Sequence, residues 1–183
     1  MRARFFRVLL RRWDRHTPEI VRRAALQILM RTTARAFQAP GRRIWTRSWK
    51  DGLQEYAEYT REHSLDTGVD PDRLYAQAYA LGARIRSVTG FRDDADLRRL
   101  VFWLYQGIGI SISGELPGEI TVSGCFFSDS YASEQCRLMS NMDSGIVGGV
   151  MGGGRLVFTE RITEGRKCCR ACLRREEVNH GKN

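Results

Sequence analysis

The stretch at residues 107–124 reads "GIGISISGELPGEITVSG" and marks the point where the apolar pattern changes from a helical to an extended period. Isoleucine and valine alternate with small or polar residues on both sides of "GELPGE", which is typical of half-buried strands. Glycine and proline between the two runs favour a tight connection. We therefore predict a β-hairpin here, and the rest of the fold is inferred outward from it.

Helical patterns precede the hairpin. In "VDPDRLYAQAYALGARIRSVTG", Asp70 is placed to cap a helix, Pro71 to open it and Gly90 to close it. The apolar residues that recur at the helical interval are Leu74, Ala78, Leu81, Ile85 and Val88. A further helix is predicted from about 94 to 106, with Leu97, Leu100, Val101 and Leu104 buried. The region before the hairpin is thus expected to be helical.

The segment after the hairpin is predicted to complete a small sheet. We expect a helix over about 129–141, a strand at "RLVFTERIT" and a last short strand across "CCRACLR". The passage "GIVGGVMGGG", residues 145–154, lacks the Lys and Ser/Thr of a phosphate-binding loop, and we interpret it as a flexible loop that could form a lid over a cysteine site. The predicted class is α+β: N-terminal helices followed by a small antiparallel sheet with one packed helix.

Basic residues are concentrated at the start of the chain. The formal net charge is +9, but residues 1–50 hold 14 Lys and Arg against two acidic residues, whereas the remainder is slightly acidic. We therefore divide the chain into a basic amphipathic helical arm, 1–50, an α+β cysteine-containing domain, 51–176, and a polar tail, 177–183.

The first segment, residues 1–16, places aromatic and aliphatic side chains on one helical face and arginines around the remainder. Such a helix suits peripheral contact with an anionic membrane or with a partner protein. Packing on the domain or on a second subunit of a homo-oligomer, or service as an organelle transit peptide, are the alternatives. A second helix is expected to begin with Thr17 as its N-cap and Pro18 at its first position, and to end before Ala39.

The sequence favours a reducing, cytoplasmic location, and peripheral attachment to a membrane is the alternative. The apolar run "FFRVLL" is too short and too charged for a cleavable signal, and no stretch reaches the roughly 20 apolar residues of a spanning helix. Trp45 and Trp49 lie among basic residues, as in some single-strand binders, but no repeat or RNA-binding motif accompanies them. Nucleic acid is therefore not the favoured partner; a small-molecule substrate or ligand is.

Five cysteines lie in the C-terminal third of the chain: Cys125, Cys136, Cys168, Cys169 and Cys172. Cys169 and Cys172 form a CxxC, which with Cys125 and Cys136 could supply four thiolates to zinc or an iron–sulfur cluster. The wide spacing of the first pair differs from that of a zinc ribbon, and buried inert thiols are the other alternative. The three histidines lie outside this region, so no Cys–His dyad is indicated.

The order of residues around these cysteines carries a family resemblance. "CFFS" stands at 125–128, "CRLMSNMD" at 136–143, "FTERITEG" at 158–165 and "RKCC" at 166–169. This order resembles the C-terminal half of the L-2-amino-thiazoline-4-carboxylic acid hydrolase family, over roughly residues 74–173. A weaker similarity links the chain to 4-vinyl reductase (4VR) sensor domains, an α+β family that binds small apolar or aromatic ligands.

The hydrolase resemblance implies that water opens a small cyclic C–N compound of the thiazoline-carboxylate type. Such a reaction needs a nucleophile at an electrophilic carbon and a proton for the departing nitrogen. Cys136 or Cys169 is the candidate thiolate, activated water is the alternative nucleophile, and Cys125 is a supporting thiol. Neighbouring cations such as Arg137 and Arg170 are expected to lower the thiol pKa values.

Three charged residues complete this hypothesis. Asp143 is the candidate acid and base, and Arg155 or Arg161 is the candidate anchor for a substrate carboxylate. The alternative is that Asp143 ends a helix and that both arginines are solvated.

Two functional hypotheses therefore stand side by side. The first is a hydrolase acting on a small C–N compound through a thiol-lined pocket. The second is a non-catalytic sensor that binds a small ligand or a metal and attaches to a membrane or a partner through its N-terminal helix.

Overall fold

The structure is a computed structural model that describes residues 2–13, 18–44, 48–64 and 68–174. The helices are α1 (Arg2–Trp13), α2 (Glu19–Phe37), α3 (Trp49–Ser64), α4 (Pro71–Thr89), α5 (Asp94–Gly107) and α6 (Ser133–Met151). The strands are β1 (Ile110–Gly114), β2 (Glu119–Cys125), β3 (Arg155–Glu160) and β4 (Cys169–Arg174). Two single 3₁₀ turns, η1 (Phe126–Asp129) and η2 (Ile162–Glu164), flank α6 and β3.

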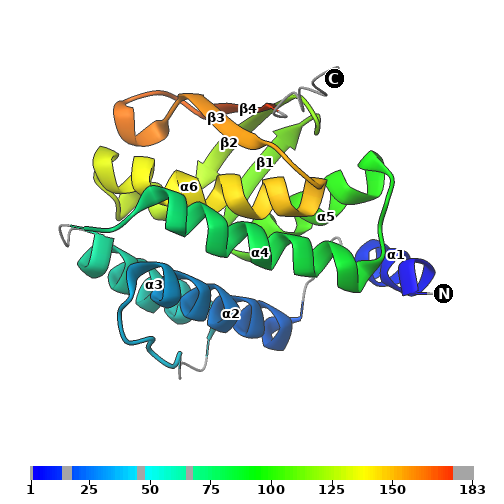
Figure 1. Cartoon of the computed structure of the whole chain (residues 1–183), viewed down its shortest axis with the longest axis horizontal. Helices are drawn as coiled ribbons and strands as arrows, with labels where there is room; N and C mark the ends of the chain where they lie inside the picture. The colour runs from blue at the N-terminus through cyan, green and yellow to red at the C-terminus, as the bar shows by residue number, and fades with distance from the viewer. Residues whose placement is uncertain (1, 14–17, 45–47, 65–67, 175–183) are drawn as a thin grey trace, which may run out of the picture.

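These elements form stacked layers (Figure 1). The four strands make one antiparallel sheet in the order β1-β2-β4-β3, and α6 lies against the sheet and against α4. Helices α2 and α3 form the layer on the other side of α4 and α6, as Figure 1 shows. The predicted α+β class is confirmed, with helices first and the antiparallel sheet afterwards.

The hairpin at 107–124 forms as its alternation predicts. β1 pairs with β2 so that Ile112 lies opposite Val122, with one irregularity in register between Ser111 and Ile112. The inward side chains that the two strands bury are Ile110, Ile112, Ile120 and Val122. A strand with one apolar face must cover that face, and here α5 packs on β1 while α6 shares a small cavity with Ile110.

The start and end of α4 agree with the capping residues predicted from the sequence. Asp70 accepts a hydrogen bond from the backbone N–H of Asp72 at 2.9 Å, Pro71 is the first helical residue, and Gly90 ends the helix with a positive φ of 72°. Leu74 is fully buried, as expected from its position on the apolar face. Val88, the last of the residues that recur at the helical interval, is 51% exposed in the last turn of the helix.

The glycine-rich passage is helix and not loop. Helix α6 runs to Met151, so residues 145–151 continue it, and the predicted flexible lid is wrong. The reason is close packing: a Cβ at Gly145 would lie 2.7 Å from the Cβ of Ala78 and would collide with the carbonyl of Tyr75. Gly149 faces α4 one turn later and is equally close to its backbone. Because these positions lack side chains, α4 and α6 approach at backbone contact.

Helix α2 contributes to the same core as the sheet. Leu26 and Met30 are completely buried in a cluster that also holds residues of α4, α6 and the strands. The predicted cap at Thr17 lies outside the described residues, and α2 ends at Phe37, close to the predicted end.

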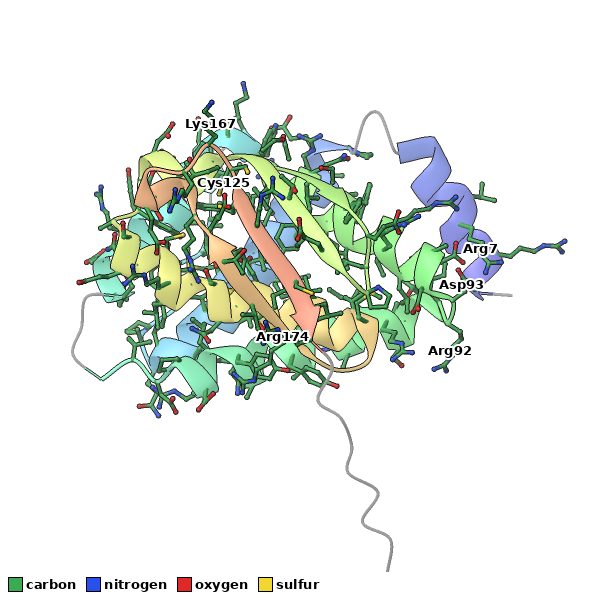
Figure 2. All side chains as sticks on the ribbon, turned by 90° about the horizontal axis from the view of Figure 1, so that it is seen from above. Arg7, Arg92, Asp93, Cys125, Lys167 and Arg174 are labelled. Atoms are coloured by element: carbon green, nitrogen blue, oxygen red, sulfur yellow. The ribbon has the colours of Figure 1, made fainter. Side chains whose placement is uncertain are left out.

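Helix α1 contacts α4 and α5. Phe6 packs against the core, and Arg7 donates hydrogen bonds to Asp93, at 2.9 Å, and to Asp96 at the start of α5. Figure 2 shows Arg7 turned toward Asp93. Phe5 and Val8 are 61% and 62% exposed, so part of the apolar surface of α1 faces outward. None of the described helices combines the length and the apolar composition required to cross a membrane.

The glycine contact between α4 and α6 predicts a test of stability. Gly145→Ala should lower the free energy of unfolding by about 2 kcal/mol, because overpacking at a backbone contact outweighs the helix propensity that alanine gains. Gly107→Ala is the control, since a Cβ at this last residue of α5 meets no atom within 4 Å. Urea unfolding of both variants should show Gly107→Ala at or above wild-type stability; an equally stable Gly145→Ala would contradict the close packing.

Candidate functional site

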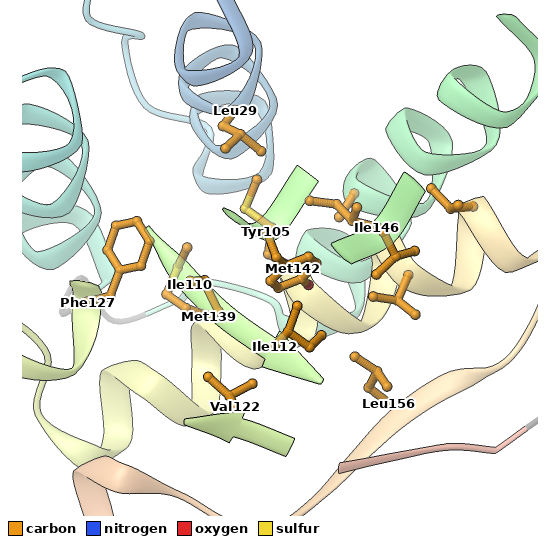
Figure 3. Close-up of a cluster of buried hydrophobic side chains, with 14 of the residues drawn as sticks. Leu29, Tyr105, Ile110, Ile112, Val122, Phe127, Met139, Met142, Ile146 and Leu156 are labelled. Carbon is orange, nitrogen blue, oxygen red and sulfur yellow. The ribbon is translucent and has the colours of Figure 1, made fainter. Parts of the chain in front are cut away.

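A cavity of about 70 Å³ lies between α6 and the hairpin, with α2, α3 and the two 3₁₀ turns completing its wall. The lining residues with chemical or steric importance are Cys125, Cys136, Cys169, Asp143, Met139 and Met142. Figure 3 shows Met139, Met142 and Ile146 of α6 beside Ile110 and Ile112 of β1, with Phe127 at one side. The wall is thus apolar, with a carboxyl group and three thiols set into it.

The thiols reach this cavity from three different elements. Cys125 ends β2, Cys136 lies in the first turn of α6, and Cys169 begins β4. β2 and β4 are neighbours in the sheet, with Val122 opposite Cys169, so both strand cysteines come to the same end of the sheet. Helix α6 crosses beneath this end and contributes Cys136. The structure therefore brings together the three cysteines and the aspartate that the sequence singled out.

Cys172 does not join them. β4 buries Cys169, Ala171 and Leu173 in alternation, so Cys172 projects from the other face of the sheet. Within the described ranges, no group of three or more His, Cys, Asp or Glu residues is arranged to hold a metal ion. The alternative of zinc or an iron–sulfur cluster on Cys125, Cys136, Cys169 and Cys172 is therefore not supported. The CxxC spacing suggested a shared metal site, but Cys169 and Cys172 lie on a strand, where the side chains of residues three apart point to opposite faces.

Asp143 is the charged group of the cavity. It is partly buried, and its carboxylate accepts a hydrogen bond from the Tyr105 hydroxyl of α5 at 3.0 Å. Burial raises the pKa of Asp143 to about 6, while the hydrogen bond from Tyr105 and the positive charge of Arg161 act in the opposite direction. A carboxyl group with this pKa is populated in both protonation states near neutral pH, as a general acid and base must be.

The thiols are held in their protonated form. Burial raises the pKa of Cys125 to about 12 and also raises the pKa values of Cys136 and Cys169. The expectation that nearby cations would lower these values is wrong, because the cations pair elsewhere. Arg137 donates to Glu164 at 2.8 Å, and Arg170 donates to Glu119 at 3.0 Å. The backbone N–H of Ile162 donates a hydrogen bond to Cys169 Sγ, at 3.4 Å, which opposes the effect of burial on this thiol.

The two candidate anchor arginines differ in their surroundings. Arg155 pairs with Asp72 at 3.1 Å and lies over the ring of Tyr75, away from the cavity. Arg161 is largely buried, and its positive charge lowers the pKa values of Asp143, Cys136 and Cys169. Its Nε atom is buried with no hydrogen-bond acceptor in the described part of the chain. Arg161 also forms a long ion pair with Glu164, at 3.8 Å, and lies over the ring of Phe158. Of the two arginines, it is the one whose charge acts on the groups of the cavity.

Several lining or supporting residues escaped the sequence prediction. Tyr105 binds Asp143, and the Tyr56 hydroxyl lies 2.8 Å from Thr33 Oγ1 and 3.2 Å from Met142 Sδ. Tyr105 follows Val101 by one helical turn, so the apolar face of the predicted helix could have revealed it. Met142 was hidden because the predicted helix stopped at residue 141, before the passage that continues its face.

Comparison of the chain with protein-family models, with curated proteins and with solved structures gave no match. The resemblance to the thiazoline-carboxylate hydrolases therefore remains a prediction from the cysteine pattern.

Asp143 predicts a pH dependence of stability. Its folded pKa of about 6 exceeds the ordinary value of 3.8, so the folded state binds more protons between these values. Its contribution is fully present below pH 3.8 and is lost as the pH rises through 6, by about 3 kcal/mol in total. Asp143→Asn should remove this loss, whereas Asp51→Asn, at an exposed position of α3, should keep it. Urea unfolding across this pH range gives the comparison, and parallel curves for both variants would contradict the burial of an ionisable Asp143.

The hydrogen bond that Tyr105 donates to Asp143 leads to a second prediction. The phenol stabilises the carboxylate, so Tyr105→Phe should move the Asp143 pKa further upward, by about one unit. Carbon-detected NMR titration of the aspartate carboxyl groups measures this directly. A pKa that stays unchanged or falls would show that the phenol does not donate to Asp143.

Proposed function

We propose that this chain is a hydrolase that opens a carbon–nitrogen bond in a small cyclic compound of the thiazoline-carboxylate type. The observation that carries the proposal is the Asp143 carboxyl in an apolar cavity, bonded to Tyr105 and with its pKa raised to about 6. A carboxylate that is easily protonated and shielded from bulk water is suited to move one proton during hydrolysis.

Asp143 acts first as a base and then as an acid. Its carboxylate takes a proton from water, and the water oxygen forms a bond to the electrophilic amidine carbon. When this adduct collapses, the bond from that carbon to nitrogen breaks and the nitrogen takes the proton from Asp143. The Tyr105 hydroxyl holds the carboxyl in place throughout, and one water is consumed for each bond opened.

Water suits this role better than a cysteine thiol. The raised pKa values of Cys136 and Cys169 leave little thiolate near neutral pH. Cys136 precedes Asp143 by seven residues, which is roughly 10 Å along the helix axis, so the two do not exchange a proton directly. They face the cavity from positions about two turns apart on one helix, and a small ring can lie between them. We assign the thiols to the wall that contacts this ring.

The size of the cavity limits the substrate. At about 70 Å³ it has about half the volume of the roughly 150 Å³ cavity that holds benzene in an engineered protein. A five-membered ring with substituents therefore enters only if side chains move, and Met139 and Met142 are flexible enough to do so. Arg161 pairs with Glu164 at 3.8 Å, and its Nε has no hydrogen-bond acceptor among the described residues, so it is the cation that a substrate carboxylate would meet.

The proposal predicts how variants behave with 2-amino-thiazoline-4-carboxylate as substrate. Asp143→Asn should lower kcat by a factor of about 10² to 10⁴, the usual share of general acid–base catalysis, while the chain stays folded. Cys136→Ser should retain most of the activity, and Cys172→Ser, on the other face of the sheet, should be unaffected. In wild type, kcat/KM should rise with pH through about 6, the Asp143 pKa. Product mass and a thiol assay identify the reaction.

Each part of the proposal can fail separately in this assay. If Cys136→Ser lost turnover while Asp143→Asn stayed active, the nucleophile would be the Cys136 thiol and not water. A free thiol in the product would show that the carbon–sulfur bond breaks and would overturn the C–N assignment. Absence of turnover with thiazolines and related cyclic amidines would remove the hydrolase proposal.

A non-catalytic sensor domain is the second candidate, and the mainly apolar wall with protonated thiols favours it. In that case Asp143→Asn should still bind an apolar ligand and no compound should be turned over. The N-terminal helix α1, with exposed Phe5 and Val8, would then link the domain to a membrane or partner. Calorimetry with an aromatic ligand, alongside the turnover assay, separates the two candidates.

A further inference from the structure

A second hollow lies outside the cavity, between α1, α2, α4 and α5. Its volume is about 490 Å³, and it shares no lining residue with the cavity. Its apolar wall consists of Leu81, Ile85 and Val88 from α4 and Leu100, Trp103 and Leu104 from α5. Phe6 of α1 and Ile28 of α2 complete it. We call this hollow the helical groove.

Arginines line the side of the groove formed by α2 and α4. Arg31 and Arg84 belong to its lining, and Arg35 lies one turn after Arg31 beside an adjoining hollow of about 280 Å³. That hollow shares Arg31 and Arg84 with the groove, so the two form one continuous depression. The lining of both contains no carboxylate, and none of the three arginines has an ion-pair partner in the described part of the chain.

The three arginines of this side are solvent-exposed and carry like charges close together. Arg31 and Arg35 are spaced four residues apart on one helix, where like charges destabilise the helix, and Arg84 adds a third from the helix opposite. Elsewhere in the described chain, arginines such as Arg7, Arg137 and Arg155 pair with carboxylates. The arginines of the groove are therefore placed to bind a negative charge from outside the chain.

The surroundings of the groove are also unusually apolar. The exposed large apolar side chains in the described residues are Phe5, Val8, Ile20, Ile28 and Val88. All belong to α1, α2 and α4, and both Ile28 and Val88 line the groove itself. Ile28 and Val88 thus form an exposed apolar edge of the groove, and an exposed apolar patch at a hollow is typical of a binding surface.

We propose that the helical groove binds a single-chain amphiphile with an anionic head group, its alkyl chain against α4 and α5 and its carboxylate or phosphate at Arg31, Arg35 and Arg84. The volume falls within the roughly 300–1,000 Å³ typical of small-ligand sites. It is small for a docked α-helix, whose diameter with side chains is about 10–12 Å. The head group could belong to a free fatty acid or to a membrane lipid, and the experiment below distinguishes them.

The test uses the full chain with decanoate and with 1-decanol, which has the same chain length and an uncharged head. Isothermal calorimetry should show one decanoate bound per chain and much weaker binding of 1-decanol. The double variant Arg31→Glu/Arg84→Glu should weaken decanoate binding roughly tenfold or more, since two favourable charge contacts become repulsive. Lys167→Glu, which makes the same kind of charge change on the loop before β4 (Figure 2), should bind as wild type does.

A second variant addresses the apolar wall. Val88→Asp places a carboxylate in the groove at a half-exposed position, so circular dichroism should show an intact fold while decanoate binding falls. Equal binding of decanoate by wild type and by all variants would overturn the proposal. Absence of decanoate binding by the wild type would do the same.

Vesicles of phosphatidylglycerol identify the source of the head group. If decanoate binds and also displaces the chain from sedimenting vesicles, the groove takes its ligand from a membrane. If decanoate binds and the chain does not sediment, the ligand is a free amphiphile. If the chain sediments with vesicles but does not bind decanoate, the proposal for the groove is wrong and the lipid contact belongs to the exposed face of α1.

Discussion

The backbone contact between α4 and α6 is the constraint on which the rest of the structure depends. Gly82 of α4 and Gly145 and Gly149 of α6 lie at the crossing, and a side chain at any of them would meet backbone atoms of the other helix. Side-chain packing normally keeps helix axes about 8–10 Å apart, and small residues allow a closer approach. Because α6 is held so tightly, the face it turns toward the sheet has a defined position.

That face carries the chemistry. Cys136, Met139 and Asp143 follow one another at three- and four-residue intervals, so a single helix presents a thiol, a flexible apolar side chain and a carboxyl group to one cavity. Helix α4 also takes part in the second hollow, because it contributes Arg84 and Val88 to the lining of the helical groove. A helix that fixes the catalytic candidate on one side thus also helps to shape a cationic, apolar depression on the other.

The sequence allowed the local features to be predicted and left the long-range ones open. Alternation around the hairpin and the caps at Asp70 and Gly90 are signals within a few residues, and the structure forms both elements as expected. Glycine has low helix propensity, so the end of α6 was predicted as loop; only the contact with α4 explains why helix is stable there. Likewise, Arg137 and Arg170 are neighbours of thiols in the sequence but pair with Glu164 and Glu119 in the fold, which leaves burial to set the thiol pKa values.

The alternation of β4 has a consequence for oxidation chemistry. In a helical CxxC the two sulfur atoms can meet, and the pair can cycle between dithiol and disulfide. On a strand, three residues span about 10 Å and the side chains leave opposite faces, whereas a disulfide requires Cα atoms within about 7 Å. Cys169 and Cys172 therefore cannot form a disulfide while β4 stays in the sheet. An oxidant would meet two separate thiols, one in the cavity and one on the outer face, and could modify the outer one without closing the cavity.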